Sequence, residues 1–254
     1  AVAGADHQRA DHVRDAPTTL RVAAASDLAA AMAELDATFE KHSGVKIELS
    51  LGSTGLFARQ IAEGAPFDVF AAASAAYVDD VVKAGACDAS TRSIYGRGRI
   101  VLWSSKSVGL GAPTLAALTG PSVKKIAIAN PEHAPYGVAA KDALVHAGIW
   151  DKVSSKIVYG ENIQQTLQLA RSGNVEVAVV ALSLAIAPAT SAIGTYTPVD
   201  DALYAPIEQA LVVCRTNSAG GKDVARVAAA KRFAAFVTST QGRAILSRYG
   251  FSPP

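Results

Sequence analysis

The sequence predicts an α/β fold with two lobes, and three observations support this prediction. Strand-like apolar runs alternate with segments of helical periodicity along the chain, which is typical of α/β folds with a mainly parallel sheet. The alternation passes through two cycles, and the second begins near residue 100. A chain of 254 residues is long enough for two cores. We expect a flexible tail over 1–17, one lobe formed by 18–97 plus 208–254, and a second lobe formed by 98–207.

In the first cycle, each expected helix follows an expected strand. Apolar residues at positions 28, 32, 35 and 39 recur at helical spacing, and Gly44 follows them as a stop signal. The segment 45–49 alternates apolar and charged residues, as a half-buried strand does. The first cycle therefore predicts strands over 20–24, 45–49 and 67–72, and helices over 28–43, 56–63 and 75–83.

The second cycle repeats this pattern and then returns to the first lobe. It predicts strands over 100–103, 125–129, 156–159, 175–182 and 209–213. Helices are expected over 137–146, from 163 to a stop at Gly173, over 224–237, and from 241 towards the end. We expect the chain to cross between the lobes near 96–99 and to return near 206–209.

Composition and charge exclude several classes of function. The net charge of +2 is small and no dense stripe of Lys and Arg occurs, so a nucleic-acid partner is not expected. No apolar stretch reaches the roughly 20 residues that a membrane span needs. Residues 1–17 lack the apolar core of a signal peptide, so we expect a mature chain from which one has been removed.

The cysteines and histidines are few. Cys87 and Cys214 fit either one disulfide in an oxidising compartment or two inert buried thiols, and we favour the thiols. None of the five histidines pairs with a cysteine at metal-ligand spacing, which argues against a structural zinc site.

Two uncharged hydroxyl segments begin the first two expected helices. Ser26 lies in the segment AASDL (24–28), and Ser53 and Thr54 lie in GSTG (52–55). Such helix starts offer orphan backbone N–H groups and a favourable dipole to an anion. Taken alone, Ser26 is most simply an N-cap. The second segment lacks the lysine of a P-loop and the spacing of a nucleophile elbow.

The second lobe has two helix starts of the same kind. The loop NPEHAPYG (130–137) precedes one helix, and GENI (160–163) begins the next. Each is an ordinary helix start when taken alone. Four helix starts after four strands, two in each lobe, instead predict an anion site in a cleft between the lobes.

Catalytic machinery is not apparent in the sequence. His133 is the one histidine in a site-like loop, and no motif pairs it with a serine. The carboxylates near the helix starts show no spacing that identifies glycosidase chemistry. We therefore expect a binding protein rather than an enzyme. The alternative is an enzyme for phosphate esters that uses the helix N-termini as a phosphate site.

These segments together resemble the periplasmic molybdate-binding proteins of bacterial ABC transporters, the ModA family. The similarity extends from about residue 20 to residue 251. It rests on four segments: AAASDL (23–28), GSTGLFARQI with GAP (52–61 and 64–66), NPEHAPYG (130–137) and RYGF (248–251).

The resemblance implies a two-lobe periplasmic-binding-protein fold that closes over one tetrahedral oxyanion. It implies hydroxyl and N–H donors at Ser26 and at Ser53 or Thr54, and backbone N–H donors at Tyr136 and Ile163. The ligand would be molybdate or tungstate, with molybdenum present only within the bound oxyanion and no cofactor. A monomeric receptor that delivers its ligand to an ABC permease is implied, and a sulfate receptor is the nearest alternative.

The chain departs from the family pattern at one donor. Some members add a tyrosine hydroxyl from the strand over 177–182, where this chain has Ala181, and Tyr136 is expected to close the cleft instead. A site made only of neutral donors avoids the desolvation cost of buried ion pairs and rejects protonated phosphate. Because a carboxylate repels an anion, we expect the side chain of Asp27 to point away from the ligand.

Overall fold

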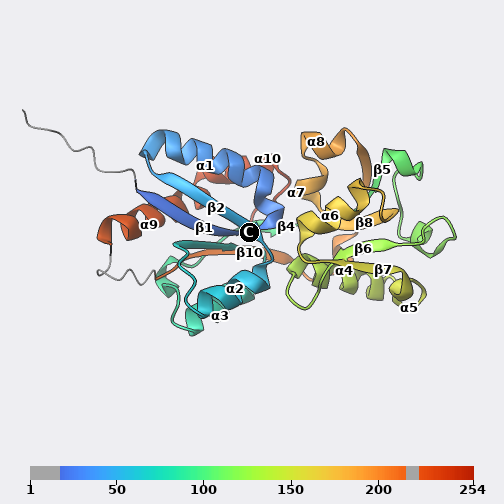
Figure 1. Ribbon diagram of the computed structural model, residues 1–254, viewed down its shortest axis with the longest axis horizontal. Helices are drawn as coiled ribbons and strands as arrows, with labels where there is room; N and C mark the ends of the chain where they lie inside the picture. The colour runs from blue at the N-terminus through green and yellow to red at the C-terminus, as the bar shows by residue number, and fades with distance from the viewer. Residues whose placement is uncertain (1–17, 216–222) are drawn as a thin grey trace, which may run out of the picture.

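Two five-stranded sheets lie side by side along the long axis of the computed structural model, which describes residues 18–215 and 223–254 (Figure 1). The first sheet, in the order β2-β1-β3-β10-β4, contains β1 (Thr19–Ala25), β2 (Lys46–Gly52), β3 (Val69–Ala72), β4 (Ser93–Gly98) and β10 (Ile207–Val213). The second, in the order β7-β6-β8-β5-β9, contains β5 (Ile100–Ser105), β6 (Ile126–Ala129), β7 (Ile157–Gly160), β8 (Val177–Ala181) and β9 (Gly194–Pro198).

Each sheet has its own helices, and we call the two parts the first half and the second half (Figure 1). The first half holds α1 (Ala29–Ser43), α2 (Thr54–Ala62), α3 (Ala75–Lys83), α9 (Val224–Thr238) and α10 (Thr240–Arg248). The second half holds α4 (Pro135–His146), α5 (Trp150–Val153), α6 (Ile163–Arg171), α7 (Leu182–Ala185) and α8 (Pro188–Ser191). No helix in the described part of the chain is long and apolar enough to cross a membrane.

The first sheet is covered by apolar side chains on both faces. Leu20, Val22 and Ala24 of β1 pack with α1, α9 and α10 on one face. Ala23 of the same strand packs on the other face, in the core that includes residues of α2 and α3. A strand buried on both faces is almost wholly apolar, which explains why 20–24 could be predicted as a strand.

The sheets are mixed rather than mainly parallel, so this part of the prediction was wrong. Four strand pairings are parallel and four are antiparallel. The chain leaves the first sheet through β4 and comes back through β10, so these two neighbours run in opposite directions. The observed α/β fold confirms the expected fold class. The boundaries proposed for the lobes, 18–97 plus 208–254 and 98–207, stay a prediction, and the expected tail over 1–17 lies outside the described residues.

Two edge strands were not predicted. Strands β4 and β9 carry glycine, and β9 also ends in proline. Both residue types are unfavourable within a sheet but are tolerated at an edge. Both strands occupy the edges of their sheets, so their sequences carry little strand signal.

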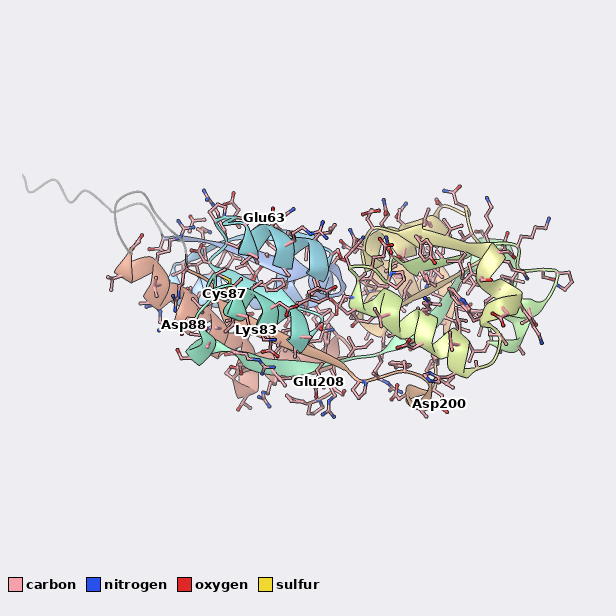
Figure 2. All side chains as sticks on the ribbon, turned by 90° about the horizontal axis from the view of Figure 1, so that it is seen from below. Glu63, Lys83, Cys87, Asp88, Asp200 and Glu208 are labelled. Carbon is pink, nitrogen blue, oxygen red and sulfur yellow. A yellow bond between two sulfur atoms is a disulfide. The ribbon has the colours of Figure 1, made fainter. Side chains whose placement is uncertain are left out.

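Cys87 and Cys214 form a disulfide, so the expectation of two thiols was wrong. Both residues are buried, and a β-bridge pairs them just beyond β10. Cys87 lies in the first half, away from the junction with the second half (Figure 2). The bond links positions 127 residues apart within the first half.

Candidate functional site

All five predicted site residues meet at one small cavity between the two halves. Ser26, Ser53 and Thr54 come from the first half, and Tyr136 and Ile163 from the second. Each lies between the carboxyl end of a strand and the first turn of the helix that follows it, the place where α/β sheets bind ligands. The remaining lining residues are Ala25, Asp27, Gly52, Ala73, Ala134, Pro135 and Asn162.

Ser26 extends its hydroxyl across the junction rather than capping its own helix. A 3₁₀ turn (Ser26–Leu28) precedes α1, and Ala25 occupies its N-cap position without a side-chain bond. The hydroxyl of Ser26 donates to Oδ1 of Asn162 at 3.3 Å and accepts from the backbone N–H of Gln164 at 3.4 Å. Its interpretation as a simple N-cap is therefore wrong.

Ser53 behaves in the same way at the start of α2. It occupies the N-cap position, but its side chain makes no capping bond. Its hydroxyl donates to the backbone oxygen of His133 at 2.7 Å and lies 2.8 Å from the Nδ1 atom of that ring. The amide groups of the first turn of α2 are therefore not occupied by this side chain.

Thr54 makes a different contact from its neighbour. Its hydroxyl accepts the backbone N–H of Ala73 at 3.0 Å, within the first half, and the residue is buried. The hydroxyl of Ser53 faces the second half instead. Which of the two hydroxyls donates to a ligand stays a prediction.

The second half contributes the first turns of two helices. Tyr136 lies in the first turn of α4, and Ile163 begins α6, whose N-cap Asn162 accepts the N–H of Gln165 at 3.0 Å. Backbone N–H groups in the first turn of a helix have no partner within it, and the helix dipole favours an anion there. Both halves therefore direct helix N-termini at the same cavity.

The two walls are in direct contact beside the cavity. The backbone N–H of Gly55 donates to the oxygen of His133 at 2.8 Å. A Cβ at Gly55 would lie 2.7 Å from that oxygen and 2.9 Å from the Cα of His133. Real Cβ atoms do not approach so closely, so only glycine permits this contact.

A buried polar network links the halves next to the cavity. The hydroxyl of Tyr136 donates to Oδ2 of Asp27 at 2.8 Å, and the amide of Gln209 donates to the same oxygen at 2.6 Å. Tyr95 donates in turn to Oε1 of Gln209 at 2.7 Å. Tyr136 thus reaches from the second half to the first, and its role in closing the cleft stays a prediction.

Asp27 is the most unusual member of this network. It is 1% exposed, and its buried Oδ1 atom has no hydrogen-bond partner among residues 18–215 and 223–254. Loss of hydration raises the pKa of Asp27 to about 6, although the hydrogen bonds from Gln209 and Tyr136 oppose the rise. Whether its carboxylate points away from a bound anion stays a prediction.

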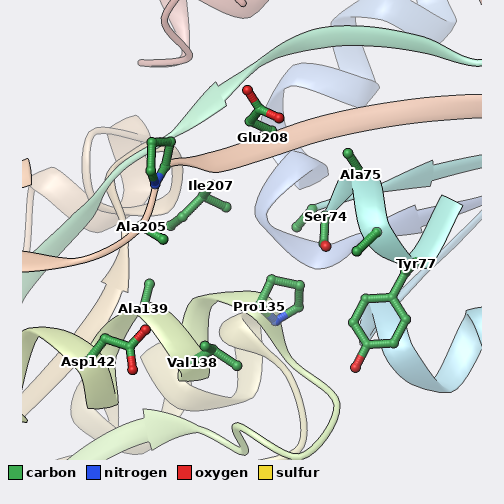
Figure 3. Close-up of a pocket in the computed structure, with 13 residues that line it drawn as sticks. Ser74, Ala75, Tyr77, Pro135, Val138, Ala139, Asp142, Ala205, Ile207 and Glu208 are labelled. Carbon is green, nitrogen blue, oxygen red and sulfur yellow. The ribbon is translucent and has the colours of Figure 1, made fainter. Parts of the chain in front are cut away.

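The charges around the junction distinguish this cavity from a neighbouring groove. In the described part of the chain, no Lys or Arg lines the cavity. The second groove, between α3, α4 and the segment before β10, is lined in part by Tyr77, Asp142 and Glu208, and its described lining residues also include no basic one (Figure 3). The carboxylate of Asp142 disfavours an anion in this groove, whereas the carboxylate of Glu208 pairs with Arg97 at 3.4 Å. The cavity with the four helix starts is therefore the better candidate.

Three residues of this region were not singled out from the sequence as binding or positioning residues. Asn162 lies at a predicted helix start, and its N-cap side chain was a usable signal. His133 was considered only as a catalytic base, and Gln209 lies within an expected strand without any local signal.

Ala181 is buried and does not line the cavity. The described residues contain no group of three or more His, Cys, Asp or Glu placed to hold a metal ion.

Comparison with known proteins identifies the family. The model of the family "Bacterial extracellular solute-binding protein" matches residues 20–252. The molybdate-binding protein ModA of Azotobacter vinelandii is 35% identical over 232 residues, which cover 91% of this chain and 89% of that protein. ModA of Rhodobacter capsulatus is 32% identical over 237 residues, covering 90% and 89%.

A solved structure agrees with these sequence matches. The periplasmic molybdate-binding protein of Azotobacter vinelandii superimposes with a TM-score of 0.79 at 29% identity, covering 92% of this chain and 99% of that one. The resemblance found in the sequence is therefore confirmed. The chain belongs to the bacterial extracellular solute-binding proteins, in the group that contains these molybdate-binding proteins.

Proposed function

We propose that this protein is an extracytoplasmic receptor that captures molybdate, and also tungstate, and delivers it to an ABC permease. The observation that carries the proposal is the cavity between the halves, which is lined by hydroxyl groups and helix N-termini and, as far as the structure describes the chain, by no basic side chain. Similarity to two molybdate-binding proteins supports the choice of ligand.

The proposed site holds the anion through neutral donors. Ser26 and Ser53, with Thr54 as the alternative, supply hydroxyl and N–H groups from the first half, and Tyr136 and Ile163 supply backbone N–H groups from the second. Hydrogen bonds to an ion are short and strong. Neutral donors also avoid the desolvation penalty of a buried cation. Such a set suits an ion whose oxygens are all acceptors.

Opening and closing of the two halves would exchange protein contacts for ligand contacts. The hydroxyls of Ser26 and Ser53 now bond to Asn162 and His133 of the opposite half, and rotation about one side-chain bond can redirect each hydroxyl to an anion. A ligand that contacts both halves stabilises the closed form relative to the open form. We propose that the closed form is the one presented to the permease.

The proposal includes the remaining properties of a transport receptor. We propose a monomer that acts outside the cytoplasm and binds no nucleic acid. It would release its cargo chemically unchanged and would need neither a catalytic residue nor a cofactor.

Thermal unfolding of desalted protein with molybdate, tungstate, sulfate or phosphate tests the proposal. A ligand at 100 times its dissociation constant stabilises the folded protein by about 2.7 kcal/mol. That corresponds to a rise in Tm of roughly 5–10 °C for a chain of this size. The proposal expects this rise with molybdate and tungstate alone, with sodium chloride at equal ionic strength as the control. A rise with sulfate or phosphate alone would replace the proposed ligand, and no rise with any anion would refute the receptor function.

A further inference from the structure

A buried carboxylate lies beside the proposed anion without a cation to neutralise it. Asp27 follows Ser26 directly in sequence and lines the same cavity. It is 1% exposed, so water screens its charge poorly. An ionised Asp27 and a bound dianion would place three negative charges in one small space.

The hydrogen bonds of Asp27 leave room for a proton. Its Oδ2 atom already accepts from Tyr136 and Gln209. Its Oδ1 atom is buried, and the described residues place no hydrogen-bond partner on it. A buried carboxylate oxygen without a donor is costly when charged, and protonation removes that charge.

The side chains that face Asp27 from the described residues carry no positive charge, although hydrogen bonds from Gln209 and Tyr136 and from the backbone N–H groups of Asp27 and Leu28 partly stabilise its carboxylate. These side chains are Tyr95 from β4, Tyr136 from α4, Gln209 from β10, and Ser183 from α7, which donates to the backbone oxygen of Asp27. Burial and the Asp27 carboxylate raise the pKa values of both tyrosines well above their ordinary range, so both remain neutral donors.

His133 and Glu161 are further titratable side chains beside the cavity. The ring of His133 lies 2.8 Å from the hydroxyl of Ser53, and its Nε2 atom lies 3.7 Å from a carboxylate oxygen of Glu161. A His133 variant is therefore compared with an Asp27 variant in the test below.

We propose that closure on the dianion takes up one proton, which Asp27 holds as a carboxylic acid. The charge of the filled cavity then changes from −3 to −2. This inference rests on the proposed function, since it requires a dianionic ligand. An ionised Asp27 beside the anion would oppose binding, whereas a protonated Asp27 would not.

The direction of the pH dependence follows from the same charges. Burial already raises the pKa of Asp27 to about 6, and a neighbouring dianion raises it further. Molybdate therefore binds more tightly as the pH falls from about 8 towards 6. The dissociation constant changes by up to about tenfold per pH unit where one whole proton is taken up.

Isothermal titration calorimetry measures directly how many protons are taken up on binding. Molybdate is titrated at pH 6.5 into the intact protein in three buffers of different ionisation enthalpy. The observed binding enthalpy is plotted against the ionisation enthalpy of the buffer, and the slope of this plot gives the number of protons taken up. The expected slope is between one half and one proton for the wild type and close to zero for Asp27→Asn. Loss of the slope in His133→Gln would assign the proton to another group and overturn the inference.

The outcomes separate this inference from the proposed function. Molybdate binding without proton uptake in the wild type would overturn the inference and leave the receptor function standing. Equal uptake in Asp27→Asn would assign the proton to another group and also overturn it. Absence of binding in the wild type would refute both. Should Asp27→Asn fail to fold, the dissociation constant of the wild type between pH 6 and 8 decides, because a pH-independent value contradicts proton uptake.

Discussion

Substitution of Gly55 by alanine should weaken ligand binding without destabilising the free protein. Gly55 lies in the first turn of α2, where its N–H donates to the oxygen of His133 in the opposite half. The added Cβ would lie 2.7 Å from this oxygen and 2.9 Å from two carbons of His133. The closed arrangement cannot contain both the methyl group and this backbone.

The size of the effect follows from these distances. Non-bonded atoms are comfortable at about 3.5–4.0 Å, so the two walls must separate by roughly 1 Å at Gly55. This separation breaks the hydrogen bond to His133, worth about 1 kcal/mol, and stretches the neighbouring bond from Ser53. The affinity for molybdate should fall at least about tenfold, which is 1.4 kcal/mol. Alanine favours a helix over glycine by up to about 1 kcal/mol, so an opened free protein should be no less stable.

Calorimetric titration with molybdate and thermal unfolding of the free protein measure the two effects separately. Gln60→Ala is the matched control, because Gln60 is exposed on the same helix and faces no such contact. It should leave the affinity unchanged. A wild-type affinity in Gly55→Ala would refute the argument that the closed arrangement is the ligand-binding form.

Three further predictions concern the site and the stability of the fold. Ser53→Ala should lower the affinity for molybdate at least about tenfold, as measured by calorimetry. Thr54→Val should instead lower the free energy of unfolding in urea by about 1–3 kcal/mol, because the buried N–H of Ala73 loses its acceptor. The reverse pattern would exchange the roles of the two residues. Replacing Cys87 and Cys214 by serine should cost roughly 2–5 kcal/mol in the same urea assay, and an unchanged midpoint would argue against the disulfide. Burial raises the pKa of Asp36 from 3.8 to about 7, so its ionisation destabilises the fold as the pH rises from about 4 through 7. Asp36→Asn should therefore raise Tm at pH 8 but not at pH 4. An equal rise at both pH values would contradict this direction of the pH dependence.

The central parts of the fold were predictable because their signals are local. The buried strands β1 and β6 are continuous apolar runs, and α3 was predicted with its observed bounds of Ala75–Lys83. The structure also brings the five predicted site residues to one cavity, since the carboxyl ends of neighbouring strands meet there. Their role in binding an anion stays a prediction.

Contacts between distant segments were not predictable. The hydroxyls of Ser26 and Ser53 bond to residues of the opposite half, and no local pattern reports the position of that half. The pairing of Asp27 with Tyr136 joins positions 109 residues apart. The disulfide depends on where β10 ends relative to Cys87, which the spacing of two cysteines does not reveal. In each case the missing information is how two distant segments pack against each other.

Equilibrium titration of the wild-type protein with molybdate, in the presence of a large excess of sulfate, measures the stoichiometry and the selectivity of the proposed site together. We propose that the two halves close on one tetrahedral anion through hydroxyl and N–H donors, in a cavity that selects its ligand by size and by the absence of protons. This proposal predicts one molybdate per chain, with an affinity that excess sulfate lowers little. Displacement of molybdate by sulfate, or no saturable molybdate binding, would contradict it.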